Sequence, residues 1–144
     1  MIVHWDGTTW RTQTSGTQRE LYGVWGAAPD NLWAVGGHGT LLHWNGATWS
    51  AGSSGITSEL RDIWAADAND AWAVGINHDH DSAGVLLKWN GANWTQHENG
   101  AVGALEGVWG ANADNIWAVG FDYTAWTGKI LKWNGSTWSE QLSG

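Results

Sequence analysis

Two short segments of the sequence carry side chains suited to binding a ligand, and the first is NHDHD at residues 77–81. It brings imidazole and carboxylate groups together in consecutive positions, namely His78, Asp79, His80 and Asp81. These groups are ligands for divalent cations such as Zn²⁺, whereas Ca²⁺ is disfavoured because the spacing D-x-D-x-D-G is missing. In an extended segment the two histidines would share one side and the two aspartates the other. We therefore expect either a divalent-metal site or a solvated polar loop.

The second segment, FDYTAW at residues 121–126, is rich in aromatic side chains. Aromatic rings stack on the C–H faces of sugar rings, and a neighbouring carboxylate can accept hydrogen bonds from sugar hydroxyl groups. Phe121, Tyr123 and Trp126, together with Asp122, are therefore candidates for a carbohydrate-binding site. The alternative is a loop that folds back on its own aromatic side chains.

Both segments interrupt a sequence repeat. A pair of tryptophans around an Asp-Gly or Asn-Gly dipeptide occurs as HWDGTTW (4–10), HWNGATW (43–49), KWNGANW (88–94) and KWNGSTW (132–138). The first tryptophans of successive copies are 39, 45 and 44 residues apart. A period of about 40–45 residues is typical of a β-propeller blade with four antiparallel strands. The repeat therefore predicts an all-β propeller.

The first full copy indicates where the four strands of a blade should lie. Strands are expected at 21–27, 32–36, 40–44 and 47–50, and the first two are joined by a turn that contains Pro29, which presets φ. No segment of the chain shows a sustained helical period, so almost no helix is expected.

The Asn-Gly dipeptides predict how the tryptophan pairs are placed. Asn-Gly between strand residues is typical of a two-residue hairpin, because both central residues need positive φ. In such a hairpin Trp44 would face Ala47 and Leu42 would face Trp49, so that the two indoles are diagonal neighbours on one face. A blade must bury at least one face against its neighbour, and most tryptophans are therefore expected to pack between blades.

Counting strands divides the chain into three full blades at 21–59, 60–104 and 105–144, preceded by a half blade at 1–20. Propellers have about four to eight blades, so this chain does not close a ring by itself and would expose a tryptophan-rich blade face. Such a face is typical of an interface. We expect oligomerisation to complete the ring, with a homodimer of about seven blades favoured by the strand count. Exchange of the N-terminal hairpin between chains and truncation of a longer propeller are the alternatives.

The best-matching copies are GVWGAAPDNLWAVG (23–36) and GVWGANADNIWAVG (107–120). They resemble the repeats of tectonin and tachylectin-type β-propellers, a resemblance that touches every copy and hence nearly the whole chain. It implies a lectin that binds glycans on or between blades. The second element here is centred on tryptophan and not on tyrosine, so no sugar-contacting position is transferred. The hairpin WDGTTW (5–10) is also similar to the Asp-box of sialidase-like propellers but is one residue shorter, and we interpret it as a shared turn without shared chemistry.

Composition excludes several classes of function. The net charge is −8 and the six Lys and Arg residues are scattered, so nucleic acid is not expected as a partner. The chain has no run of about 18 apolar residues and no signal-peptide organisation, which predicts a soluble protein without membrane insertion and leaves its compartment open. Cysteine is absent, which excludes disulfides and thiolate metal sites. No cofactor is expected apart from a metal at the first segment.

No catalytic motif is present, neither a nucleophile elbow nor a phosphate-binding loop nor H-E-x-x-H. We therefore expect a non-catalytic, lectin-like propeller that binds glycans multivalently. The alternative is a self-assembling structural propeller, engineered or truncated, that binds no small molecule.

Overall fold

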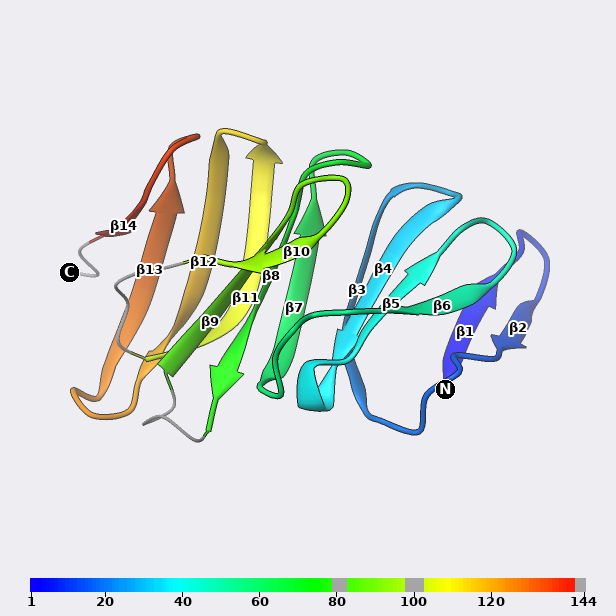
Figure 1. Ribbon diagram of the computed structural model, residues 1–144, viewed down its shortest axis with the longest axis horizontal. Helices are drawn as coiled ribbons and strands as arrows, with labels where there is room; N and C mark the ends of the chain where they lie inside the picture. Colours follow the sequence, from blue (N-terminus) through cyan, green and yellow to red (C-terminus); the bar gives the residue numbers. More distant parts are fainter. Residues whose placement is uncertain (79–82, 98–102, 142–144) are drawn as a thin grey trace.

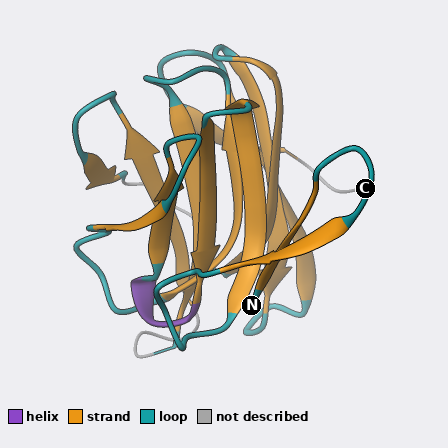
Figure 2. Ribbon diagram, turned by 90° about the vertical axis from the view of Figure 1, so that its right-hand side faces the viewer, coloured by secondary structure: helices purple, strands orange, loops and turns teal. Residues whose placement is uncertain are grey.

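The computed structural model describes residues 1–78, 83–97 and 103–141, which form four antiparallel sheets (Figure 1). The strands are β1 (Ile2–Trp5), β2 (Trp10–Gln13), β3 (Leu21–Ala28), β4 (Asn31–Gly36), β5 (Leu41–Trp44), β6 (Trp49–Gly52), β7 (Glu59–Ala65), β8 (Ala71–Asn77), β9 (Ala83–Trp89), β10 (Trp94–Gln96), β11 (Ala104–Asn112), β12 (Asn115–Asp122), β13 (Thr127–Trp133) and β14 (Trp138–Gln141). Within these ranges the only helical element is the short 3₁₀ turn η1 (Gly37–Gly39), purple in Figure 2. None of the described helical structure is long and apolar enough to cross a bilayer.

The sheets are β-propeller blades, as predicted. Blade 1 consists of β3–β6, blade 2 of β7–β10 and blade 3 of β11–β14, each with its strands hydrogen-bonded in chain order, whereas β1 and β2 pair only with each other and form the N-terminal hairpin. The blades stand side by side with β3, β7 and β11 adjacent, the hairpin at one end of the row and blade 3 at the other (Figure 1). Figure 2 views the row from the hairpin end.

The second strand of each blade contains a glycine that is required by packing. At Gly36, Gly75 and Gly120 a Cβ would lie 1.9, 1.8 and 1.9 Å from a backbone carbonyl oxygen at the start of the blade's first strand. No side chain fits at that distance, because the two strands approach too closely. The repeated Trp-Ala-Val-Gly sequence therefore encodes the close pairing of the inner two strands.

The hairpin turns differ from the prediction in one respect. The side-chain Oδ1 of Asn45 accepts hydrogen bonds from the backbone N–H groups of Ala47 and Thr48, at 3.0 and 2.9 Å. The turn therefore spans four residues, and Trp44 pairs directly with Trp49, at a ring-centroid distance of 5.6 Å. The predicted two-residue turn and diagonal indoles are wrong, because the asparagine side chain closes a longer loop.

Tryptophans pack between blades, as predicted. We call the face of a blade that points toward the next blade in chain order its forward face, and the opposite one its backward face. Trp33 on the forward face of blade 1 lies 5.1 and 5.2 Å from the ring centroids of Trp89 and Trp94 in blade 2. One blade later, Trp72 lies 4.9 and 5.2 Å from Trp133 and Trp138 in blade 3. We call this arrangement, a second-strand indole against a hairpin pair, the three-tryptophan unit.

Aliphatic side chains fill the remainder of each interface. Between blades 1 and 2, Val35 and Leu41 pack against Leu60, Ile63 and Leu87, and all five are buried. Between blades 2 and 3, Val74 and Leu86 take the positions of Val35 and Leu41. The core is therefore a series of similar layers between blades, a form typical of repeat proteins.

A backbone contact also joins the inner strands of blades 2 and 3. The Oδ2 of Asp62 on β7 accepts a hydrogen bond from the N–H of Val108 on β11, at 3.0 Å. A carboxylate that receives a backbone N–H makes a charge-assisted bond, which is stronger than a neutral one. The two blades are thus fixed by polar as well as apolar contacts.

Candidate functional site

A large apolar groove lies between the N-terminal hairpin and the backward face of blade 1. Its volume is about 730 Å³, within the usual range for ligand pockets of about 300–1,000 Å³. Residues of the N-terminal hairpin and of all four strands of blade 1 line it, among them Ile2, Trp5, Trp10, Val24, Trp44 and Trp49. We call it the hairpin groove.

The groove lies beside the edge of the hairpin where a full blade has its inner two strands. In all three full blades the third strand pairs with the second on one side and the fourth on the other. Strand β1 corresponds to a third strand, and its only pairing partner in the described chain is β2. Its second edge therefore presents backbone N–H and C=O groups that another extended segment can pair with.

The backward face of blade 1 is exposed at positions that a preceding full blade would bury. Val24 on β3 corresponds to Ile63 on β7 and Val108 on β11, which the preceding blade buries, but Val24 is 60% exposed. The pair Trp44–Trp49 likewise has no second-strand tryptophan against it, whereas both later hairpin pairs have one. The groove is thus an interblade interface with one side open.

Polar groups occur at the margins of the groove. The indole N–H of Trp49 donates to Oε1 of Gln13 at 2.8 Å and ties the hairpin to blade 1. The hydroxyl group of Tyr22 donates to a Glu20 carboxylate oxygen at 2.7 Å, and this bond raises the pKa of the phenol above its ordinary value. An apolar floor with few polar groups at its rim suits an apolar peptide segment better than a charged small molecule.

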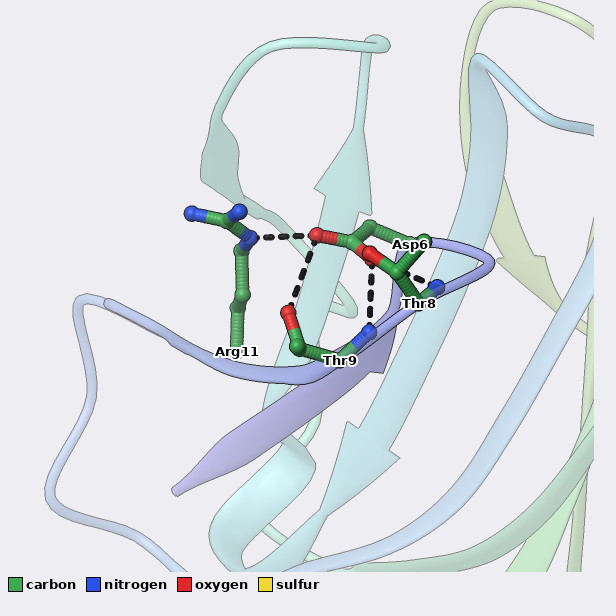
Figure 3. A network of polar contacts seen from close by, with 4 residues as sticks. All are labelled: Asp6, Thr8, Thr9 and Arg11. Atoms are coloured by element: carbon green, nitrogen blue, oxygen red, sulfur yellow. Dashed lines mark hydrogen bonds and ion pairs between the residues drawn. The ribbon is translucent and has the colours of Figure 1, made fainter.

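The turn of the N-terminal hairpin is closed by a polar network (Figure 3). Oδ1 of Asp6 accepts hydrogen bonds from the backbone N–H groups of Thr8 and Thr9, both at 2.9 Å, and from the Thr8 hydroxyl at 2.7 Å. Its Oδ2 receives the Arg11 guanidinium. The Thr8 and Arg11 bonds are the largest causes that hold the pKa of this carboxyl far below its ordinary value. The network fixes the hairpin that carries the unpaired β1 edge.

The aromatic segment forms a cluster at the β12–β13 turn. The ring of Phe121 lies 5.1 Å from that of Tyr123 and 6.0 Å from that of Trp126, centroid to centroid. Trp126 is 77% exposed and has a positive φ of 55°. The rings therefore contact one another, as in the folded-back alternative, and still leave one indole in solvent.

The carboxylate of Asp122 in the same segment is hydrogen-bonded within the turn. Its Oδ1 accepts hydrogen bonds from the hydroxyl and N–H of Thr124 and from the N–H of Ala125, at 2.6, 2.9 and 3.0 Å. The carboxyl is buried, and Lys129 Nζ lies 3.9 Å from Oδ2. These bonds lower its pKa, the Thr124 hydroxyl most strongly. A sugar hydroxyl would have to compete for oxygens that already have partners.

The metal-site prediction falls largely outside the described residues, because Asp79, His80 and Asp81 lie there. His78 is described, and its Nε2 lies 3.3 Å from a Glu59 carboxylate oxygen. The described part of the chain holds no group of three or more potential ligands from His, Cys, Asp and Glu. The metal site stays a prediction.

The first strands of the blades also carry a polar row, formed by Tyr22 of β3, Arg61 of β7 and Glu106 of β11. Arg61 lies over the ring of Tyr22 at 4.9 Å, and its Nε is 3.8 Å from the Glu106 carboxylate. Its Nη2 contacts Glu59 at 2.7 Å. The three side chains thus meet across adjacent blades, and Arg61 lies within ion-pair distance of two carboxylates.

Fold and groove together define a β-propeller segment with an open interblade interface beside the N-terminal hairpin. Two solved structures are similar in fold, YCF48 from Cyanidioschyzon merolae and YCF48 bound to a D1 peptide. They have TM-scores of 0.63 and 0.64 and identities of 18% and 17%, over 86% of this chain in both cases. The chain spans 40% of the length of each. No protein-family model matches the sequence, and no curated protein does.

Proposed function

We propose that the chain is a protein-binding propeller segment that takes an extended apolar peptide segment into the hairpin groove. The observation that carries the proposal is the unpaired edge of β1 beside an apolar groove of about 730 Å³. Adding a strand to an open sheet edge is a general mode of peptide recognition, in which backbone hydrogen bonds give affinity and pockets for alternate side chains give specificity.

The neighbouring blades indicate which side chains the segment should carry. A strand beside β1 would take the position of a second strand, which is Trp-Ala-Val-Gly in every full blade. Its tryptophan would lie against Trp44 and Trp49 and complete a three-tryptophan unit. The valine two residues later would point to the same face. The expected partner is therefore a segment with a large aromatic residue followed two positions later by a β-branched one.

The similar fold with a bound peptide supports this class of function. The YCF48 structure in question carries a D1 peptide, and a propeller is a rigid support for such a site. At 17% identity the likeness concerns the fold, so the partner is defined here by the chemistry of the groove and not by that peptide.

A direct test uses the chain's own second strand as the probe. The capped peptide DNIWAVGF, residues 114–121, is titrated into the protein by isothermal calorimetry. We expect binding to the wild type and to Val119→Glu, and loss of binding in Val24→Glu, which places a charge on the groove floor. Replacing the peptide tryptophan by alanine or N-methylating its backbone should also abolish binding. Equal binding by Val24→Glu would refute the groove as the site.

A second candidate function is glycan binding at the aromatic turn, in keeping with the resemblance to lectin propellers. The observation that favours it is the solvent-exposed indole of Trp126 beside Phe121 and Tyr123. A stacking platform of this kind binds sugars weakly, and several sites in one assembly would act multivalently. Because Asp122 already makes hydrogen bonds within the turn, stacking on the aromatic rings would contribute most of the affinity for a sugar.

A glycan array with and without EDTA tests this candidate. Binding that disappears in Trp126→Ala and persists in EDTA would support the aromatic turn. Binding that EDTA removes would instead support a metal at residues 78–81. A blank array with folded wild-type protein would exclude glycan binding by either segment.

A further inference from the structure

The two ends of the row of blades carry complementary parts of one interface. At the forward end, Trp117 and Val119 of β12 take the positions that Trp33 and Val35 have in blade 1 and Trp72 and Val74 in blade 2. Val35 and Val74 are fully buried by the next blade, whereas Val119 is 48% exposed. Among the described residues, no hairpin pair therefore covers the forward face of blade 3 as it covers those of blades 1 and 2.

At the other end, the N-terminal hairpin carries a pair that lacks a second-strand tryptophan. Trp5 and Trp10 are 5.7 Å apart, close to the 5.6, 5.7 and 5.8 Å of the other three pairs. Trp10 is 68% exposed, whereas its counterparts in blades 2 and 3 lie against Trp33 and Trp72. The alternation of β1 and β2 places this pair on the face opposite Gln13, which contacts blade 1, and both tryptophans also border the hairpin groove.

We propose that the forward face of blade 3 in one copy packs on the backward face of the N-terminal hairpin in a second copy. Trp117 then lies against the second copy's Trp5 and Trp10 and forms a three-tryptophan unit of the kind present twice within the chain. The proposal rests on the internal interfaces as a template and does not depend on the peptide-binding proposal.

Lys132 provides an independent match to the template. Between blades 2 and 3, Lys88 Nζ lies 4.8 Å from the Trp72 ring centroid and 5.1 Å from that of Trp133, so one ammonium group contacts an indole of each blade. Lys132 Nζ lies 5.0 Å from the Trp117 centroid. In the joined copies the hairpin tryptophan Trp5 supplies the second ring, since it corresponds to Trp133. Such cation–π contacts strengthen when they are desolvated.

The pair Trp44–Trp49 is a less suitable partner for blade 3. Blade 3 carries its own outer strands β13 and β14, which would need the space that β1 and β2 occupy beside blade 1 (Figure 1). Only a segment without outer strands fits there. The two sites therefore suit different partners, a full blade against Trp5–Trp10 and a strand or hairpin in the groove, although Trp5 and Trp10 border both.

The contact joins two different surfaces, so it either closes a ring or continues as a filament. Each chain contributes four sheets to the row, and two copies therefore supply the eight positions of a propeller ring at the upper end of the usual size of about four to eight. The strands of two chains are enough for seven four-stranded blades. They fill eight positions because each two-stranded hairpin occupies a position of its own. The two hairpin grooves stay open within that ring.

Sedimentation and light scattering of the purified chain test the proposal. We expect twice the chain mass of 15.6 kDa for the wild type. We expect Val119→Glu to be monomeric, because an unpaired charge in the contact raises the dissociation constant by about 100-fold or more. Val24→Glu, the same change on the groove floor, should remain dimeric. A monomeric wild type at millimolar concentration, or a dimeric Val119→Glu, would overturn the proposal.

A mixing experiment establishes which surfaces meet. Val119→Glu and Trp10→Glu each disable one of the two surfaces and should each be monomeric. Mixed together, they retain one intact contact between different copies and should form a one-to-one complex, whereas either variant alone should not. Circular dichroism checks that both are folded. A contact made by two identical faces would give no such complementation, and its absence would contradict the head-to-tail arrangement. Peptide binding by monomeric Val119→Glu keeps the two proposals separately testable.

Discussion

Trp72 offers the most direct test of what holds the blades together. It is fully buried on the forward face of blade 2, and its ring lies within about 5 Å of Trp133, Trp138 and Lys88. An indole buries roughly 200 Å², which at about 25 cal/mol per Å² corresponds to about 5 kcal/mol of transfer free energy. Alanine retains part of that area, and we expect Trp72→Ala to lower the free energy of unfolding by about 4 kcal/mol.

Urea unfolding followed by circular dichroism measures this change, and the thermal midpoint should fall by about 8–16 °C for a chain of this length. Trp126→Ala is the matched control because its side chain is 77% exposed, and its effect should stay within about 0.5 kcal/mol. Both proteins are compared at one concentration, low enough to suppress association.

Trp72→Phe refines the test. The indole N–H of Trp72 is buried and has no hydrogen-bond acceptor in the described part of the chain. Phenylalanine removes that unpaired donor and keeps an aromatic ring, so the loss should be well below that of the alanine variant. If Trp72→Ala and Trp126→Ala changed stability equally, the blades would not be held by buried indoles and the reasoning would be wrong.

Three further predictions concern other parts of the molecule. Gly75→Ala should destabilise the protein by about 3 kcal/mol, because a Cβ there would lie 1.8 Å from the Glu59 carbonyl oxygen. Gly128→Ala is the control and should be near neutral in urea unfolding, because a Cβ at Gly128 would meet none of the surrounding residues within 4 Å. Asp122 has a lowered pKa, so the stability it contributes is complete above the ordinary carboxyl pKa and is lost as the pH falls through that range. The stability difference between the wild type and Asp122→Asn should therefore shrink on acidification, and a pH-independent difference would argue against a charged Asp122. Dimerisation should strengthen with added salt, because each copy carries a net charge of −8; sedimentation across a salt series would show the opposite trend if ion pairs dominated the contact.

The architecture could be predicted from the sequence because each blade repeats the same local sequence features. A glycine that allows close strand pairing, an Asx-closed turn and a tryptophan on a fixed side recur at a nearly constant period. These are local properties, and they place the strands to within one or two residues. The type of loop at the hairpin turns was harder to predict, because the Asn45 side chain competes with the backbone for the same N–H groups.

The hairpin groove could not be located in the same way. No residue of the sequence marks it, because it lies beside an edge of β1 that has no pairing partner in the described part of the chain. The strand count did indicate an incomplete blade, and the open face follows once Val24 is compared with its buried counterparts in β7 and β11. Contacts such as Arg61 over Tyr22 link blades that are far apart along the chain, and periodicity alone does not orient them.

The hairpin turns also have a consequence for the chemical lifetime of the protein. Asn-Gly is the dipeptide most prone to deamidation, because glycine leaves its backbone nitrogen unhindered for attack on the side-chain carbonyl. Asn45, Asn90 and Asn134 stand in such turns, and each side-chain oxygen holds two backbone N–H groups. The N-terminal hairpin has Asp6 at this position with the same pair of bonds. Conversion to aspartate would therefore preserve the turns, whereas isoaspartate, with its longer backbone, would move the indoles apart, so aged samples should lose blade contacts one hairpin at a time.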